Sequence, residues 1–315
     1  CFFVFYFIMA IPASLMIERT GYKRGFSIGL LTIGLGALIF LPASRFVSYP
    51  LFLLGLYTMA TGSVILQVVA NPYVIILGKP ETASSRLNLA QGVNSLATTT
   101  APLLGGMLIL GDYDTKEAAT AAVEGPYLGL AIFAFLIAVI FYFLKLPKVL
   151  DTDGEKVKGN VLKFRQLRLG VIALMLYVGA EVAIGSFIVN FLGESNIAGF
   201  AEKRAATYIP LYWGGLMVGR FLGSAILQKI SAQKVLFISS LASVLSLSIT
   251  IVSDGYVAMW SMLAVGLFNS IMWSNIFTLS VDGLGKYTNK ASGILVMAPV
   301  GGAILPLMQG ILADM

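Results

Sequence analysis

Long apolar stretches separated by short polar segments make up most of the chain. A helix needs about 20 mostly apolar residues to cross the hydrocarbon core of a bilayer, with a usual range of about 17–25. Stretches of this kind cover residues 1–17, 26–44, 50–77, 86–111, 126–146, 168–193, 204–229, 233–253, 255–280 and 291–313. The pattern predicts an all-α integral membrane protein with about ten spans.

The composition excludes a soluble domain and several kinds of chemistry. The 315 residues are 58% hydrophobic and 11% charged, whereas soluble domains carry about 25% charged residues. The chain has no His and one Cys, so it offers no histidine base, zinc cluster or disulfide. It also lacks the glycine-rich Lys loop that binds ATP phosphates. We therefore expect no enzymatic activity, no catalytic residues, no metal and no cofactor.

Positively charged residues are concentrated in alternate loops. If residues 1–17 run toward the cytoplasm, the cytoplasmic loops hold 16 of the 21 Lys and Arg residues. An excess of Lys and Arg on cytoplasmic loops is general among membrane proteins. The bias predicts the orientation of the chain, and it explains the net charge of +6 without a nucleic-acid partner.

A charged segment divides the predicted spans into two sets of five. Its Pro, Gly and alternating charges are typical of a solvated segment, and we predict a cytoplasmic linker at 148–167. The predicted domains are an N-terminal half bundle at 1–147 and a C-terminal half bundle at 168–315. The two halves resemble one another weakly, and such parallel repeats are a known plan of transporters.

Amide side chains gather in two neighbouring predicted spans, 50–77 and 86–111. They are Gln67, Asn71, Asn88, Gln91 and Asn94. Moving an amide into an apolar medium without a hydrogen bond costs about 2–7 kcal/mol. The five amides therefore indicate either a shared wet cavity or mutual hydrogen bonds. For Asn71 a third interpretation is that it repairs the helix bend that Pro72 introduces.

In the second of these spans, polar residues recur every three or four positions, which places them on one face of a helix. The face is formed by Asn88, Gln91, Asn94 with Ser95, and Thr98. Amides both donate and accept hydrogen bonds, so the face suits sugar hydroxyls. It suits a neighbouring helix as well, because Asn, Gln and Ser commonly join helices in membranes. Both interpretations stay open from the residues alone.

Glu181 is the only carboxylate deep within a predicted span. Inserting a charged residue costs about 2.5–3.5 kcal/mol, so ionisable residues in spans are functional candidates by default. A carboxyl that alternates between two solvent accesses can carry a proton. We predict that Glu181 is the proton or cation site, or a direct substrate ligand. The alternative is a protonated acid bonded to Tyr177, one turn away.

The C-terminal half offers further candidate ligands for a substrate. They are Asn190, Asn269 and Trp273. The broad amphipathic ring of Trp273 can stack on the apolar face of a sugar, with core packing as the alternative.

Charged residues near the predicted inner ends of spans are candidates for gating. Glu18, Arg19 and Arg24 are predicted to latch the cytoplasmic side, with the general bias of positive charge as the alternative. Arg220 is predicted to be their second-half counterpart, which pairs with acids or extends along its helix toward the membrane surface.

Several motifs together resemble the major facilitator superfamily. They are ERTGYKR (18–24), QVVANPY (67–73), SRLNLAQGVNS (85–95), YVGAE (177–181) and GLFNS (266–270). The first resembles the loop motif between helices 2 and 3 of that superfamily. The others resemble its fucose–galactose–glucose:proton symporter family, in particular the glucose/galactose transporter type. The resemblance covers essentially the whole chain and makes its spans helices 2 to 11 of twelve. The chain starts at Cys1 inside an apolar stretch, and we expect it to be a fragment.

The resemblance implies a secondary active transporter that imports a hexose, glucose or galactose first, by alternating access with proton symport. Gln91 and Asn94 match the sugar-contacting amides of the family. Fucose-type members carry an acid in helix 4 where this chain has Gln67, so the proton-carrying role does not pass to that position. The alternatives are fucose, an N-acetylhexosamine or another solute, sodium as the coupling ion, and a membrane sensor that transports nothing. The expected partners are the sugar and the lipid bilayer of a bacterial inner membrane, and the expected state is a monomer.

Overall fold

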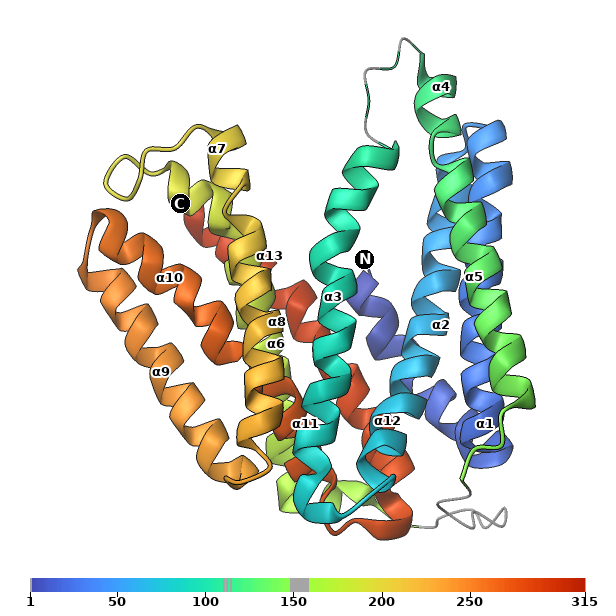
Figure 1. The fold of residues 1–315 in the computed structure, drawn as a ribbon. Helices are drawn as coiled ribbons and strands as arrows, with labels where there is room; N and C mark the ends of the chain where they lie inside the picture. Colours follow the sequence, from blue (N-terminus) through green and yellow to red (C-terminus); the bar gives the residue numbers. More distant parts are fainter. Residues whose placement is uncertain (1, 110, 112, 114, 148–158, 315) are drawn as a thin grey trace. The chain divides into compact units, whose positions relative to one another are not determined.

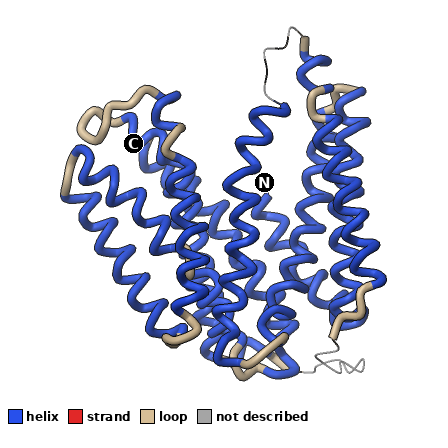
Figure 2. Tube along the Cα trace, viewed as in Figure 1, coloured by secondary structure: helices blue, strands red, loops and turns tan. Residues whose placement is uncertain are grey.

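The computed structural model describes residues 2–109, 111, 113, 115–147 and 159–314. These residues form helices and loops, and no strand occurs among them (Figure 2). The predicted all-α class is therefore confirmed. Contacts between Cα atoms group the chain into two compact units, each of which is described by itself. Unit 1 comprises Cys1–Tyr73, Ala101–Val161 and Leu284–Met297, and unit 2 comprises Val74–Thr100, Leu162–Gly283 and Ala298–Met315.

Each predicted apolar stretch contains a helix (Figure 1). The first part of the chain forms α1 (Phe2–Arg45), α2 (Tyr49–Ile76), α3 (Ala83–Ile109), α4 (Lys116–Ala121) and α5 (Glu124–Phe143). The second part forms α6 (Arg165–Gly193), α7 (Glu202–Ala206), α8 (Ile209–Ile226), α9 (Ala232–Val252), α10 (Gly255–Asn269), α11 (Met272–Val281), α12 (Thr288–Met297) and α13 (Gly301–Ala313). Short 3₁₀ turns lie at Pro80–Thr82, Val161–Lys163, Gly285–Tyr287 and Ala298–Val300.

Three predicted boundaries differ in detail from the observed helices. The first two stretches run together in α1, and only Gly21, with φ of 76°, breaks the helical geometry between them. A positive φ is accessible to glycine because it has no Cβ. The stretch 255–280 is divided into α10 and α11, and 291–313 is divided by the 3₁₀ turn that contains Pro299. Interrupted helices of this kind leave backbone groups that neighbours must satisfy.

Among the described residues, seven helical segments are long and apolar enough to cross a membrane. Two predicted spans, α3 and α8, lie outside this set. The amides and hydroxyls of α3, and the glycines and Arg220 of α8, lower their hydropathy. These two helices are therefore the spans in which polar side chains need the most internal partners.

Unit 1 is held together by close helix approaches at small residues. A Cβ built on Gly62 of α2 would lie 2.7 Å from the carbonyl oxygen of Gly29 and 2.8 Å from the amide nitrogen of Ile33, both on α1. A Cβ on Gly293 of α12 would lie 2.7 Å from the hydroxyl of Ser14 on α1. Small residues allow backbones to approach in this way, which strengthens van der Waals packing where no hydrophobic effect acts between helices.

The core of unit 2 lies between α6, α8 and α10. Its fully buried members include Ile188, Leu192, Tyr212, Leu216 and Met259. Helix α9 packs beside α10, and α13 packs along α6 (Figure 1). Gly179 of α6 lies against α13, where an added Cβ would come within 2.9 Å of the carbonyl oxygen of Gly301.

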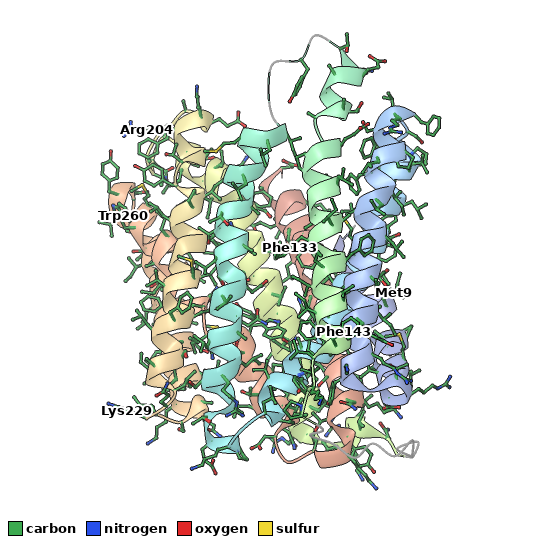
Figure 3. The ribbon with its side chains drawn as sticks, turned by 45° about the vertical axis from the view of Figure 1, so that its right-hand side comes forward. Met9, Phe133, Phe143, Arg204, Lys229 and Trp260 are labelled. Carbon is green, nitrogen blue, oxygen red and sulfur yellow. The ribbon has the colours of Figure 1, made fainter. Side chains whose placement is uncertain are left out.

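Many large apolar side chains are exposed along the helices, as lipid contact requires. Examples are Phe133 and Phe143 on α5 and Trp260 on α10, all labelled in Figure 3. In unit 2, Arg204 and Lys229 lie at opposite ends of the helices (Figure 3). Helix α8 lies between these two residues in the sequence. Apolar surfaces bounded by charged ends match a multi-pass membrane protein.

The predicted division into two halves joined by a linker stays a prediction. Residues 148–158 of the predicted linker at 148–167 lie outside the described residues. The compact units group the first 18 residues of α3 with α6 to α11, and they group α12 with α1.

Candidate functional site

The turn before α3 is fixed by Arg86, which caps the end of α2. Its Nε donates to the carbonyl oxygen of Val74 at 3.1 Å, and its Nη2 donates to that of Ile75 at 2.5 Å. Its Nη1 donates to the carbonyl oxygen of Lys79 at 2.9 Å. The last carbonyls of a helix have no partner within the helix, so a cation there satisfies and stabilises them. Arg86 thereby links the first turn of α3 to the end of α2.

The first turns of the polar face on α3 bind a neighbouring helix. Asn88 has no exposed surface, and its Nδ2 donates to Oδ1 of Asn275 on α11 at 3.1 Å. One turn earlier, the hydroxyls of Ser84 and Thr278 are 2.5 Å apart. For Asn88, therefore, the observed bond is the interhelical one that membrane amides commonly make.

The next turns of the same face have greater exposure. Gln91 is half-buried, and Asn94 and Thr98 are exposed. Ser95 is buried, and its hydroxyl donates to the carbonyl oxygen of Gln91 at 2.8 Å. Exposed polar groups within a span occur where they face a bundle interior or water. Gln91 and Asn94 are therefore the part of the face suited to a solute, while their role as ligands stays a prediction.

Glu181 lies near the middle of α6 in a polar surrounding. The hydroxyl of Tyr177, one turn earlier, donates to its Oε2. The hydroxyl of Tyr212 on α8 donates to the carbonyl oxygen of Glu181 at 3.2 Å. The bond with Tyr177 is the one that the sequence suggested, and it is compatible with either a structural or a coupling role.

The surrounding of Glu181 extends through Tyr212 to Asn269, the last residue of α10. The side chain of Asn269 is hydrogen-bonded to the hydroxyl of Tyr212. Its Oδ1 also accepts a hydrogen bond from the hydroxyl of Ser243 on α9 at 2.9 Å. Asn269 is thus a buried junction of three helices, and its predicted role as a sugar ligand remains a prediction.

Arg220 on α8 is directed at neighbouring helices rather than along its own helix. Its Nη1 donates to the hydroxyl of Ser95 on α3. Its Nε donates to the carbonyl oxygen of Ser270, between α10 and α11, at 3.2 Å. An electrostatic interaction also links Arg220 with Glu181. The guanidinium is therefore held inside unit 2, and its predicted gating role stays a prediction.

Trp273 and Asn190, the remaining candidates of unit 2, lie at different sites. Trp273 is half-buried, and its ring stacks on that of Phe277 with 5.1 Å between centroids. This contact fits the packing interpretation, and stacking on a sugar stays a prediction. Asn190 is exposed near the end of α6, more than two turns beyond Glu181.

In unit 1, the candidates occupy α1 and α2. Nε2 of Gln67 donates to the hydroxyl of Tyr6 on α1 at 3.2 Å, and Asn71 is buried. Glu18, Arg19 and Arg24 surround the break at Gly21. No ion pair joins these three residues to another side chain in the part of the chain that the structure describes. Their gating role stays a prediction.

Several polar partners were not singled out from the sequence. Tyr6, Ser243, Ser270, Asn275 and Thr278 each bond one of the polar residues discussed above. Asn275 and Thr278 are three positions apart, which is the spacing of polar residues that placed the candidates of α3 on one helix face. The same spacing could have identified Asn275 and Thr278 from the sequence. Within the described residues, no group of three or more acidic, His or Cys side chains is placed to hold a metal.

The pair of Asn88 and Asn275 generates a prediction about stability. Either Ala substitution should destabilise the full-length protein, because the remaining amide is left buried without its partner. The double substitution should cost less than the two single costs added together, by about 0.6 kcal/mol, the average for hydrogen bonds between membrane helices, and by about 1.7 kcal/mol at most. Thermal unfolding of the purified protein in detergent measures the cycle, with the exposed Asn190→Ala as control. Strict additivity would show that the pair contributes no coupling energy.

The chain matches the Major Facilitator Superfamily over residues 1–313. It is 49% identical to a glucose/galactose transporter of Brucella abortus, over all of this chain and 77% of that protein. It is 40% identical to a putative glucose/galactose transporter of Helicobacter pylori, over all of this chain and 79% of that protein.

A crystal structure of the Escherichia coli fucose:proton symporter superposes on the chain with a TM-score of 0.92. The sequences are 29% identical, and the match covers 99% of this chain and 82% of the other. The breadth of these matches and the helical fold confirm the resemblance. The chain belongs to the Major Facilitator Superfamily.

Proposed function

We propose that the protein is a secondary active transporter that imports a hexose, with glucose or galactose as the substrate, by alternating access and proton symport. The observation that carries the proposal is the polar network of unit 2. It connects the exposed amide face of α3 with Glu181 through Ser95 and Arg220. The similarity to glucose/galactose transporters and to a fucose:proton symporter supports both the substrate class and the coupling ion.

Sugar binding is assigned first to Gln91 and Asn94. Each amide offers a donor and an acceptor, so that one side chain can bond two hydroxyls of a pyranose. Glu181, Asn269, Trp273 and Asn190 are the further proposed ligands of unit 2, and Gln67 and Asn71 are those of unit 1. Gln67 already has a hydroxyl partner in Tyr6, which would orient its amide for this task.

Proton coupling is assigned to Glu181. A carboxyl within a span is costly as an anion, and protonation removes this cost. If the site opens alternately to the two sides of the membrane, the acid can take up a proton on one side and release it on the other. Sodium is the alternative coupling ion, because carboxylate and amide oxygens also bind cations.

The proposal has alternatives: another substrate for a transporter of the same fold, and a function other than transport. Fucose or an N-acetylhexosamine is the alternative substrate, since a fucose symporter is 29% identical over 99% of this chain. A sensor that binds sugar without transporting it is the alternative of another class. The protein is proposed to act as a monomer in a bacterial inner membrane, with the loop at 148–167 in the cytoplasm.

Uptake by the full-length protein in energised vesicles tests the function. Radiolabelled glucose should accumulate, and a proton uncoupler should abolish the accumulation. Excess unlabelled galactose should compete, and fucose and N-acetylglucosamine should compete less well. Vesicles without the protein are the control. A lack of saturable hexose uptake, with a proton or a sodium gradient, would contradict the proposal, and hexose binding without flux would indicate a sensor.

Substitution of the exposed amides tests the binding site. Gln91→Ala and Asn94→Ala should each raise KM for the sugar about tenfold. Each loses hydrogen bonds worth about 0.5–1.5 kcal/mol apiece, and 1.4 kcal/mol corresponds to a factor of ten. Concentration-dependent uptake measures the change. Thr100→Ala, an exposed residue of α3 whose hydroxyl bonds its own helix, is the matched control. An unchanged KM in both amide variants would place the sugar elsewhere.

Removal of the acid tests the coupling. Glu181→Gln keeps the size of the side chain but cannot exchange a proton. We expect it to abolish gradient-driven accumulation while sparing exchange of labelled for unlabelled sugar across the membrane. Both fluxes are measured in the same vesicles, so that the exchange confirms a folded protein. Normal accumulation by this variant would remove Glu181 from the coupling mechanism.

A further inference from the structure

An apolar groove lies on the surface of unit 1, between α1 and α5. These two helices pack side by side (Figure 1). The groove has a volume of about 170 Å³. It is lined by Ser27 and Leu31 of α1 and by Ala138, Val139, Tyr142 and Phe143 of α5. Because α5 ends at Phe143, which is labelled in Figure 3, the groove lies at the end of that helix.

The lining of the groove suits a hydrocarbon chain. Ala138 is small and buried, whereas Val139 and Phe143 on the same helix are 53% and 74% exposed. A small residue between larger ones leaves a hollow that neighbouring side chains do not fill. The hydroxyl of Ser27 donates to the carbonyl oxygen of Lys23 on its own helix at 3.4 Å. The wall of the groove therefore presents mainly apolar surface to whatever lies in it.

A positive charge stands beside the groove at Tyr142. Nζ of Lys23 lies over the Tyr142 ring, 5.9 Å from its centroid, which is within the range of a cation–π contact. Lys23 is exposed and forms no ion pair among the described residues. Tyr142 is exposed as well, and its hydroxyl is a hydrogen-bond donor. An ammonium and a phenol beside an apolar groove match a molecule that has an anionic head and a hydrocarbon tail.

The sequence around this end of the groove is mainly basic. Arg24 follows Lys23 directly, and Lys145 comes just after α5; both are exposed. Glu18, the acidic residue of α1, lies beyond the break at Gly21. The three cations belong to loops that are predicted to be cytoplasmic, and basic pockets between spans on that side of a membrane bind anionic lipid head groups. Charge complementarity therefore favours an anionic lipid over a zwitterionic one.

We propose that the groove between α1 and α5 binds an anionic phospholipid, with one acyl chain in the groove and the phosphate against Lys23 and Tyr142. The ammonium attracts the phosphate as a point charge, and the hydroxyl donates a hydrogen bond to it. A groove of this volume takes a single hydrocarbon chain, whereas a helix of a second protein is about 10–12 Å across with its side chains. The lipid bridges α1 and α5 at their predicted cytoplasmic ends, and it stabilises the folded protein because it binds that state alone.

Native mass spectrometry of the full-length protein tests the head-group contact. The purified protein is titrated with phosphatidylglycerol and, separately, with phosphatidylethanolamine of the same acyl chains. The first phosphatidylglycerol should bind more tightly than the first phosphatidylethanolamine. Lys23→Gln should raise the Kd for phosphatidylglycerol about fivefold and so remove most of the preference. Lys229→Gln, which removes an exposed cation from another predicted cytoplasmic loop, is the matched control and should keep the preference.

A second variant tests the acyl-chain contact. Val139→Phe narrows the groove without touching its charge, so it should weaken the binding of both lipids to a similar extent. Val244→Phe, at an exposed position of α9, makes the same change outside the groove and should have no effect. Thermal unfolding without lipid confirms that each variant is folded. Added phosphatidylglycerol should then raise the Tm of the wild type and of both controls more than that of the Lys23 and Val139 variants.

Cross-linking locates the bound lipid. A phosphatidylglycerol with a photoactivatable acyl chain should label peptides of α1 and α5 more than those of other lipid-exposed helices, and Val139→Phe should remove this excess. Equal labelling of all exposed helices, equal affinity for the two lipids, or equal behaviour of the Lys23 and Lys229 variants would each overturn the proposal. A dimer that Val139→Phe dissociates would assign the groove to a second copy of the chain instead. Because no sugar is present, these results do not depend on the proposed transport function.

Discussion

The hydrocarbon of a bilayer offers no hydrogen-bond partner, so every polar side chain in a span must find one inside the protein or in trapped water. The arrangement of this protein follows from that constraint. In unit 1 the amide of Gln67 is bonded to Tyr6. In unit 2 the residues Ser95, Arg220, Ser270, Tyr177 and Glu181 are joined by hydrogen bonds and charge. Apolar and small residues pack around these groups, and the polar contacts add links between the helices that meet there.

The same constraint divides α3 into a buried part and a more exposed part. Near its start, Ser84 and Asn88 are buried against α11, and they hold the helix in place. Farther along, Gln91 and Asn94 are less buried, and theirs are the amides proposed to bind a polar solute. The buried pair is incompletely satisfied, because Oδ1 of Asn88 and Nδ2 of Asn275 have no hydrogen-bond partner in the described structure. The two amides are therefore joined by a single hydrogen bond, although each could make more.

Hydropathy predicted nearly all of the helices, because the length of a span is set by the thickness of the bilayer. It did not predict the division at Ser270 and Ile271 or the 3₁₀ turn at Pro299. Those breaks depend on the neighbours that satisfy the freed backbone, as the bond from Arg220 to the carbonyl oxygen of Ser270 illustrates. The sequence also left open whether the amides of α3 bind a sugar or a neighbouring helix, for a related reason. A sugar and a neighbouring helix require the same donors and acceptors, and burial, which depends on tertiary packing, is what separates Asn88 from Asn94.

The surroundings of Glu181 follow from the same need of polar groups in spans for partners. Gln67 is an amide, and an amide cannot carry a proton. A neutral Gln67 donates to one tyrosine hydroxyl and needs no counter-charge. Glu181, the one carboxylate in the interior of the described spans, has instead a surrounding that contains a hydroxyl donor and an arginine. A hydroxyl can bond either form of the acid, whereas the arginine favours only the anion. The contrast between these two partners is what an acid needs if it is to bind a proton in one conformation and release it in another.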